Sequence, residues 1–314
     1  MGATPITVIA AAALAVAAIA LAARYVPGVN RPVLATAALA PYLAVGAPAA
    51  LILFALVHNW IGVIAAGVLT VSTIAVRLRW HVRGKLEAGV GVRIVSANLR
   101  YGRADADAVV RLARGYTDIL AVQEITPDKA DEMTAAGIDE VLPYRVLRTR
   151  EGPAGVGLWS RHPMRPGAEY DEFWLGLMTA RVQIPGVPGE VTVATTHMSA
   201  PWPEPIRGWR DDLARFAAVL SEIAAAAKGP VIVAGDLNAT PDVLEFRRLL
   251  RTGYRDAAEQ AGAGLTRTHP ADILIPPLFA VDHVLLRGGT AGAVRTPPLA
   301  GSDHRALIAD ITFD

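Results

Sequence analysis

Three long apolar runs without a charged residue occupy the first eighty residues and restrict the possible folds more than any other feature. They are Pro5–Ala23, Val33–Val57 and Trp60–Val76. Each is near the roughly 20 residues that a helix needs to cross a ~30 Å hydrocarbon layer. A single run would also fit a buried helix or a signal peptide, but the first lacks a basic start and two more follow it. We therefore expect three transmembrane helices, the second kinked by Pro41 and Pro48.

Composition changes after these runs, which suggests a division into domains. We expect a membrane domain over residues 1–83, a short linker over 84–91 and a globular body over 92–314. Residues 1–91 hold six Lys and Arg against one acid, whereas the remainder holds 24 against 28. The chain contains no cysteine, which excludes disulfides and thiolate chemistry and leaves the compartment open.

The basic residues of the front end bear on the side of the membrane that the body occupies. They follow the first run (Arg24, Arg31) and the third run (Arg77, Arg79, Arg83, Lys85), while the loop His58-Asn59 has none. The positive-inside rule therefore favours a cytoplasmic body in an integral, multi-pass membrane protein. The same arginines are also suited to bind lipid headgroups, so the bilayer itself is an expected partner.

In the body, short apolar strands start or end with polar side chains. Val231–Ala234 leads through Gly235 into Asp236 and Asn238, whose side chains share one face in an extended chain. Taken alone, this pattern also fits a turn that leads into a helix. Three other strands lead into Asn98, Glu124 and His197, and two more are preceded by Asp282 and by Asp303-His304. Since strand ends and starts meet along one edge of a sheet with antiparallel neighbours, we expect these side chains to form one site.

The residue types of this site point to phosphate chemistry. Glu124 offers the hard oxygen that Mg²⁺ prefers, although a surface carboxylate would look the same. Without a cysteine or a His-x-x-x-His pair, a dedicated zinc site is not expected. Asp282 and His304 are suited to form an acid–imidazole pair in which the carboxylate raises the imidazole pKa.

The remaining polar residues complete a hydrolytic set. Asp236 is suited to hold and deprotonate a water, and Asn98, Asn238 and His197 to donate hydrogen bonds to phosphate oxygens. A cation, a positioned water and several hydrogen-bond donors are the groups that allow water to attack a phosphate ester or anhydride. Covalent acyl chemistry fits poorly, because the set contains no nucleophilic Ser or Cys. The other histidines in the body, His162, His269 and His283, are expected to be structural.

The ordered set Asn98, Gln123-Glu124, Thr196-His197, Gly235-Asp236-Leu237-Asn238, Asp282-His283 and Ser302-Asp303-His304 resembles the endonuclease/exonuclease/phosphatase superfamily. The resemblance implies an α/β fold, a four-layer αββα sandwich of two mixed sheets with outer helices, here preceded by three transmembrane helices. It implies Mg²⁺, with Mn²⁺ as an alternative, on Glu124 with Asn98 nearby and Asp303 as a further contact. It also implies that Asp236 orients the attacking water, that Asn238 and His197 bind phosphate, and that Asp282 supports His304.

With its apolar front end, the chain most resembles a membrane-tethered actinobacterial branch that includes the VanJ-type teicoplanin-resistance proteins. That resemblance implies a lipid-pyrophosphate or phospholipid phosphoesterase whose catalytic domain faces outward. The loop charges instead favour a cytoplasmic catalytic domain. We expect an extracytoplasmic body, because the domain architecture outweighs a few loop charges. Thr268-His269-Pro270 stands where Thr-Trp-Pro is typical of the branch.

The sequence leads to three hypotheses for the function. The preferred one is a Mg²⁺-dependent phosphoesterase that hydrolyses a phosphodiester, phosphomonoester or pyrophosphate of a membrane lipid, such as undecaprenyl pyrophosphate or a phospholipid. The second is a membrane-anchored nuclease, which the mildly acidic body disfavours because nucleic-acid backbones bind to basic faces. Nucleic acid is therefore not an expected partner. The third is a catalytically silent membrane scaffold, which the retention of the full polar set disfavours.

Overall fold

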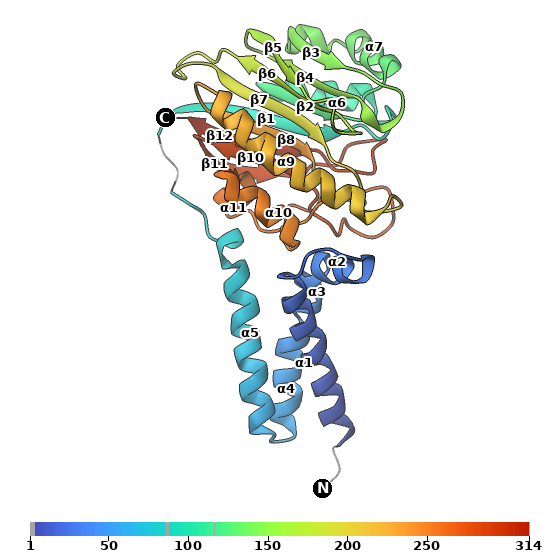
Figure 1. Cartoon of the computed structure of the whole chain (residues 1–314), viewed down its shortest axis with the longest axis vertical. Coiled ribbons are helices and arrows are strands. Elements are labelled where there is room, and N and C mark those ends of the chain that lie inside the picture. Colours follow the sequence, from blue (N-terminus) through green and yellow to red (C-terminus); the bar gives the residue numbers. More distant parts are fainter. Residues whose placement is uncertain (1–3, 86–87, 116, 314) are drawn as a thin grey trace. The chain divides into compact units, whose positions relative to one another are not determined.

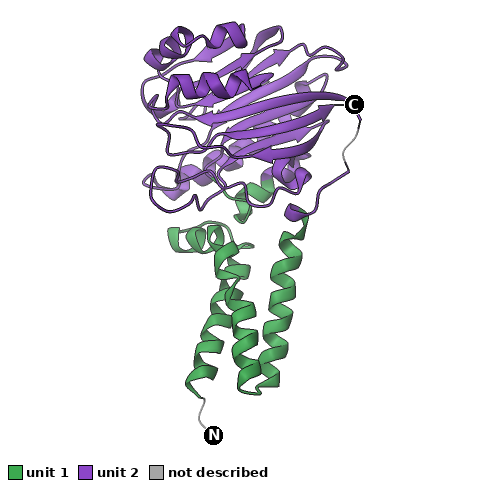
Figure 2. Ribbon diagram, turned by 180° about the vertical axis from the view of Figure 1, so that it is seen from behind, with its two compact units in different colours: residues 1–79, 239–248 green, residues 80–238, 249–314 purple. Residues whose placement is uncertain are grey.

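The computed structural model describes residues 4–85, 88–115 and 117–313. The chain forms two compact units, shown in Figure 2. Unit 1 contains Met1–Arg79 and Ala239–Arg248, and unit 2 contains Trp80–Asn238 and Leu249–Asp314. Leu86 and Glu87, within the predicted linker, lie outside the described residues, and the predicted domain boundaries stay predictions.

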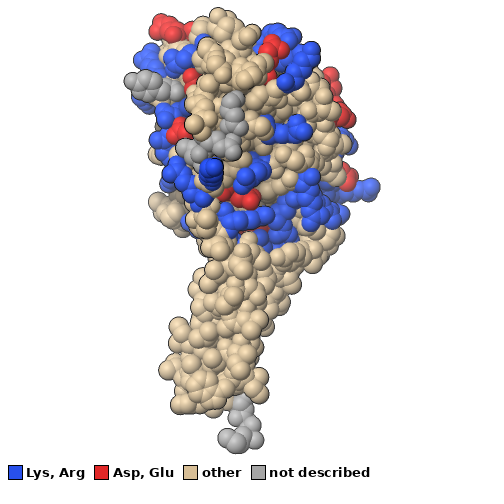
Figure 3. Space-filling view, turned by 90° about the vertical axis from the view of Figure 1, so that its left-hand side faces the viewer, with Lys and Arg blue, Asp and Glu red and all other residues tan. Residues whose placement is uncertain are grey.

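Unit 1 is built from apolar helices. Its first segment contains the helices α1 (Pro5–Ala23), α2 (Arg31–Ala38), α3 (Ala40–Leu43), α4 (Gly46–Leu56) and α5 (Trp60–His81), and the last two residues of α5 belong to unit 2. Its second segment contains most of α10 (Leu244–Leu249). Two of them, α1 and α5, are long and apolar enough to cross a membrane. The face seen in Figure 3 carries no charged side chain along most of the length of these helices.

The second apolar run does not form one continuous membrane-spanning helix. The helix Arg31–Ala38 and the stretch Ala40–Leu56 are bent by 61° from each other. The break precedes Pro41, which has no backbone N–H to donate and disfavours helical geometry in the residue before it. Whether this bent pair forms a third span stays a prediction.

Small residues let α1 and α4 approach closely. A Cβ added to Gly46 would lie 2.6 Å from the carbonyl oxygen of Ala13, so the backbones meet without a side chain between them. Ala10, Ala50 and Phe54 are buried in the same cluster. Close packing through small residues is typical of helices that associate in membranes.

A buried ion cluster joins the two segments of unit 1. Arg24 and Asp242 form an ion pair in which both side chains are almost fully buried. A second guanidinium, that of Arg77, lies with Nη2 at 3.4 Å from the same Asp242 oxygen. Nearby, Glu245 accepts a hydrogen bond from the backbone N–H of Gly28 at 2.8 Å. Buried charges are tolerated when they are paired in this way, so the segment Ala239–Arg248 is firmly held to the helix ends.

Unit 2 contains two six-stranded mixed sheets. The first has the strand order β11-β12-β1-β2-β4-β3 and the second β5-β6-β7-β8-β10-β9. The strands of the first sheet are β1 (Val90–Asn98), β2 (Ile119–Gln123), β3 (Tyr144–Arg148), β4 (Val156–Ser160), β11 (Thr290–Arg295) and β12 (Leu307–Phe313). Those of the second are β5 (Met164–Glu169), β6 (Leu177–Val182), β7 (Val191–His197), β8 (Val231–Asp236), β9 (Arg255–Asp256) and β10 (Asp282–Arg287).

Helices cover the outer faces of both sheets (Figure 1). They are α6 (Ala106–Arg114), α7 (Pro127–Ala135), α8 (Ile138–Val141) and α9 (Ile206–Ala226). The short helix α11 (Ala257–Ala261) instead contacts β11 of the first sheet and β10 of the second. Along α9 the buried positions Leu213, Phe216 and Leu220 recur at helical spacing, as the sequence predicts. The predicted four-layer αββα sandwich is therefore confirmed.

The burial of β1 shows how the sequence specifies these layers. Val92 and Ile94 lie in the cluster between the two sheets, whereas Val95 and Ala97 pack against the helices outside. A strand that is buried on both faces reads as a nearly continuous apolar run. In β1, Arg93 and Ser96 interrupt the apolar run, and the strand itself ends at the buried amide of Asn98.

Replacing Asp242 with Asn is expected to destabilise the full-length protein by about 3–5 kcal/mol, because two arginines are left without their buried counter-charge. Thermal unfolding in detergent micelles measures this. Asp211→Asn serves as the matched control, since Asp211 pairs with Arg207 at 3.6 Å on an exposed helix face. Equal unfolding midpoints for the two variants would contradict the stabilising role of the cluster.

Candidate active site

The polar ends of three strands lie side by side in the second sheet. His197 pairs with Asp236 across the parallel strands β7 and β8, and Asp236 pairs with Asp282 across the antiparallel strands β8 and β10. In the first sheet Asn98 pairs with Gln123, the residue before Glu124. The structure thus brings together, at one edge of each sheet, residues that are up to 184 positions apart, from Asn98 to Asp282.

Asn98 connects the two sheets. Its Nδ2 donates to Glu124 Oε1 at 3.0 Å and to Asp236 Oδ2 at 3.2 Å. The backbone N–H of Arg100 donates to Asn98 Oδ1 at 2.9 Å, which fixes the orientation of the amide. Asn98, Glu124 and Asp236 are all buried. The amide group therefore holds two buried carboxylates that would otherwise repel each other.

Unusual backbone conformations position these side chains. Glu124 and Asn238 have φ values of 59° and 47°, in the left-handed region that residues other than glycine rarely adopt. Glu124 Oε2 accepts from the backbone N–H of Tyr101 at 2.7 Å, and Asp236 Oδ1 accepts from that of Asn238 at 2.8 Å. Such conformations cost of order 1–3 kcal/mol each and concentrate at functional sites.

Gly235 is required by the same arrangement. A Cβ at this position would lie 1.8 Å from the carbonyl oxygen of Thr196 on the neighbouring strand β7. No side chain fits there, so glycine lets β8 bring Asp236 beside His197.

Asp282 and His304 form a buried acid–imidazole pair. His304 Nδ1 donates to Asp282 Oδ2 at 2.8 Å, and its Nε2 faces Asp236 Oδ2 at 3.6 Å. Burial alone would lower the pKa of His304, but the negative charges of Asp282 and Asp236 outweigh it and raise the pKa to about 10. Burial would raise the pKa of Asp282, yet the charge and hydrogen bond of His304 lower it. At neutral pH the pair is therefore an imidazolium and a carboxylate.

His197 and Asn238 lie on the opposite side of Asp236. His197 Nδ1 lies 3.1 Å from the carbonyl oxygen of Pro153, and a carbonyl accepts only, so this nitrogen carries the proton. His197 Nε2 then faces Asp236 Oδ2 at 3.6 Å and Asn238 Nδ2 at 3.4 Å. Asn238 Nδ2 also donates to the carbonyl oxygen of Met198 at 2.9 Å. The imidazoles of His197 and His304 thus both face the same oxygen of Asp236.

Among the residues that the structure describes, two groups of three side chains have ligand atoms within 4.8 Å of one another, namely Asp236, Asp282 and His304, and Asp303, His304 and His269. In the first group the Oδ1 atom of Asp282 is buried without a hydrogen-bond partner. Asp303 lies at the rim, with its side chain 27% exposed and 3.8 Å from Arg100 Nε. Both groups include His304, and of the predicted cation contacts Asp303 belongs to one of them while Glu124 and Asn98 belong to neither.

Several residues of the site were not predicted from the sequence. The ring of His269, expected to be structural, lies with its centroid 4.5 Å from that of His304. Ser302 Oγ donates to the carbonyl oxygen of Asn98 at 2.8 Å and accepts from the backbone N–H of His304 at 3.0 Å. The position of Ser302 next to Asp303-His304 in the sequence could have indicated its place in the site. Arg100 lies in a turn, where no periodic pattern could have indicated it.

The other two histidines expected to be structural each lie beside a carboxylate. His283 Nδ1 lies 2.7 Å from Asp256 Oδ2, and His162 Nε2 lies 3.4 Å from Asp118 Oδ1. The first pair is buried and the second is partly exposed. Both contacts fit the structural role expected for these histidines.

Replacing Asp282 with Asn is expected to lower the pKa of His304 from about 10 toward its ordinary value, because the strongest charge that stabilises the imidazolium is removed. NMR titration of ¹³C-labelled histidine in the full-length protein measures this, with His304→Gln assigning the signal. The contribution of the raised His304 pKa to stability is complete below about pH 6.5 and is lost as pH rises through about 10. An unchanged titration in Asp282→Asn would contradict the pairing.

Comparison with known proteins agrees with this geometry. The model of the endonuclease/exonuclease/phosphatase family matches residues 95–304. No curated protein sequence matches the chain significantly. Among solved structures, an endonuclease/exonuclease/phosphatase family protein from Bacteroides thetaiotaomicron is 13% identical, with a TM-score of 0.57 over 72% of this chain and 99% of that one.

Two other solved structures have related folds. D. rerio TDP2, complexed with a single-strand DNA product, is 17% identical with a TM-score of 0.57, covering 71% of this chain and 99% of that one. The mannosyl-6-phosphatase of B. thetaiotaomicron is 13% identical with a TM-score of 0.53, covering 71% and 100%. At these identities the likeness shows the fold alone. On the family match, the chain belongs to the endonuclease/exonuclease/phosphatase family, whose members are hydrolases that act on phosphate ester bonds.

Proposed function

We propose that this protein is a Mg²⁺-dependent phosphoesterase that hydrolyses a phosphate ester or anhydride of a membrane lipid, with water as the nucleophile. The observation that carries the proposal is the buried junction of Asn98, Glu124 and Asp236 beside the Asp282–His304 pair. This junction occurs in a chain whose helices α1 and α5 are long and apolar enough to cross a membrane.

Glu124 is the proposed principal ligand of the cation, with Asn98 and Asp303 as further contacts. The backbone N–H of Tyr101 already orients Glu124 Oε2, so the carboxylate is held in place before a ligand arrives. When bound, Mg²⁺ or Mn²⁺ supplies positive charge against the phosphate oxygens. Both cations prefer the oxygen ligands that these residues offer.

Asp236 is the proposed base that orients and deprotonates the attacking water. Its Oδ2 atom lies 3.6 Å from both His197 Nε2 and His304 Nε2, with Asn98 on a third side. The water oxygen forms the new bond to phosphorus, its proton passes to Asp236, and the bond to the leaving oxygen breaks. His304, held as an imidazolium by Asp282, stabilises the negative charge that develops, and Asn238 and His197 bind the remaining phosphate oxygens.

Exposed apolar side chains on two loops support a lipid substrate. Trp202 is 67% exposed and follows His197 by five residues. Ile273, Leu274 and Ile275 are all at least half exposed and lie on the loop between His269 and Asp282. Large apolar side chains of this kind are suited to contact acyl or prenyl chains. A multi-pass membrane location with the catalytic unit facing outward, as in the VanJ-type branch, is part of the same proposal.

The test is hydrolysis by the full-length protein in detergent micelles. Undecaprenyl pyrophosphate, a phospholipid and single-stranded DNA are each supplied with Mg²⁺, and release of phosphate, headgroup or nucleotide is measured. We expect lipid hydrolysis that falls by about 10²-fold or more in Asp236→Asn and in His304→Gln. Salt-sensitive cleavage of DNA alone would instead identify a membrane-anchored nuclease, and no turnover of any substrate would favour the silent scaffold.

The cation requirement gives a separate prediction. Glu124→Gln is expected to raise the Mg²⁺ concentration for half-maximal activity by about tenfold or more, since an amide offers no negative oxygen. His304→Gln should abolish turnover and leave Mn²⁺ binding, measured by calorimetry, nearly unchanged. The exposed Glu151 provides the control Glu151→Gln, which should behave as wild type. Loss of Mn²⁺ binding in the control as well would argue against Glu124 as the specific ligand.

A further inference from the structure

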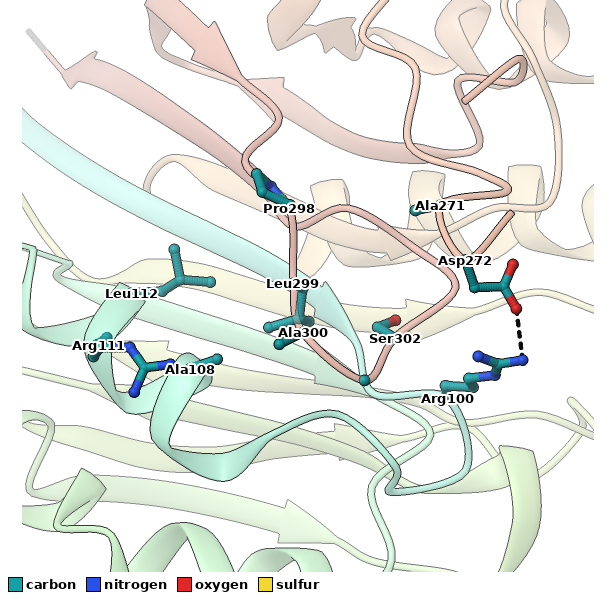
Figure 4. Close-up of a pocket in the computed structure, with 11 residues that line it drawn as sticks. Arg100, Ala108, Arg111, Leu112, Ala271, Asp272, Pro298, Leu299, Ala300 and Ser302 are labelled. Atoms are coloured by element: carbon teal, nitrogen blue, oxygen red, sulfur yellow. Dashed lines mark ion pairs between the residues drawn. The ribbon is translucent and has the colours of Figure 1, made fainter. Parts of the chain in front are cut away.

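A groove lies beside the candidate site in unit 2 (Figure 4). Its volume is about 610 Å³, within the range of small-molecule sites. Arg100 and Asp272 lie at one end and Leu112 at the other, with the loop Pro298–Ser302 between them. Arg111 lies with Leu112 at the far end, and the side chains between the two arginines are mainly apolar, which suits a ligand with an anionic head and an apolar chain.

The charged end is continuous with the candidate site. Arg100 Nε lies 3.8 Å from Asp303 Oδ2, and the backbone N–H of Arg100 is bound by Asn98 Oδ1. Ser302, which lines the groove, donates to the carbonyl oxygen of Asn98. A ligand in the groove would thus adjoin a phosphate held at the site.

The backbone holds Arg100 in this place. Arg100 and Tyr101 have φ values of 49° and 52°, so two successive residues occupy the left-handed region. The same turn supplies the N–H groups that orient Asn98 and Glu124. A conformation that costs roughly 1–3 kcal/mol per residue is maintained here, and it fixes Arg100 relative to the two proposed cation contacts.

The present partner of Arg100 is exchangeable. Arg100 Nη2 lies 2.7 Å from Asp272 Oδ2, and the two side chains are 29% and 30% exposed. Ion pairs with this exposure contribute about 0–1 kcal/mol. A phosphate group accepts two parallel hydrogen bonds from a guanidinium, which is a stronger interaction. Phosphate can therefore replace Asp272 at little cost.

We propose that this groove binds the inner phosphate and the first carbons of a lipid pyrophosphate, with Arg100 as the residue that selects pyrophosphate over monophosphate. The inference rests on the proposed function. The outer phosphorus occupies the site, water adds to it, and the bond between it and the bridging oxygen breaks. The bridging oxygen and its electron pair leave with the inner phosphate, whose added negative charge Arg100 stabilises, and the lipid monophosphate is released.

The test compares two substrates in the full-length protein. For undecaprenyl pyrophosphate, Arg100→Gln should lower kcat/KM by at least about tenfold, the size expected for a lost charged hydrogen bond. For undecaprenyl monophosphate the same variant should leave kcat/KM within about twofold. Arg100→Lys should recover part of the loss, since a lysine keeps the charge without the fork. Arg103→Gln, on the same turn but exposed, is the matched control and should have no effect.

A binding measurement makes the inference independent of turnover. In Asp236→Asn, farnesyl pyrophosphate should bind at least about tenfold more tightly than farnesyl monophosphate, and adding Arg100→Gln should remove this difference. The role of Arg100 would be overturned if Asp236→Asn bound the two ligands with equal affinity. It would also be overturned if adding Arg100→Gln weakened the binding of both ligands equally. Absence of hydrolysis by wild type with the affinity difference intact would instead contradict the proposed function alone.

Discussion

The contact on which the site depends is the hydrogen-bonded junction at Asn98. This side chain comes from the first sheet and joins Glu124, which follows a strand of that sheet, to Asp236 from the second sheet. Just behind it, Gln123 Nε2 donates to Thr195 Oγ1 at 3.1 Å, also between the sheets. Apolar contacts in the core hold the two sheets together but have no directional preference. These hydrogen bonds do have one, so they fix how the sheets align at the edge that carries the candidate site.

Much of this arrangement could be predicted from the sequence. A strand that is buried on both faces has a clear end, so Asn98, His197 and Asp236 were predicted at strand ends and lie there. The long amphipathic helix α9 and the first and third apolar runs were also visible as periodicity or length. These signals survive in a single sequence because each depends on neighbours along the chain.

The rest depends on contacts between distant residues, which periodicity does not report. Arg100 lies in a turn and His269 in an isolated β-bridge with Phe279, and only the fold places them beside Asp303 and His304. The break before Pro41 was expected as a kink, but its 61° bend depends on how the neighbouring helices pack. The grouping of Ala239–Arg248 with the apolar helices had no sequence signal, because Asp242 reads as a helix-capping residue.

That grouping affects how the chain would respond to proteolysis. If a protease nicked the chain just after α5, the covalent tether would be lost, but Asp242 and Glu245 would remain bound to Arg24 and Gly28. Separating the fragments would expose a buried arginine and a buried aspartate at once, an unfavourable step unless both are rehydrated together. The same ion pair that supports the loop after Asn238 would thus keep the segment Ala239–Arg248 with the apolar helices after such a cut.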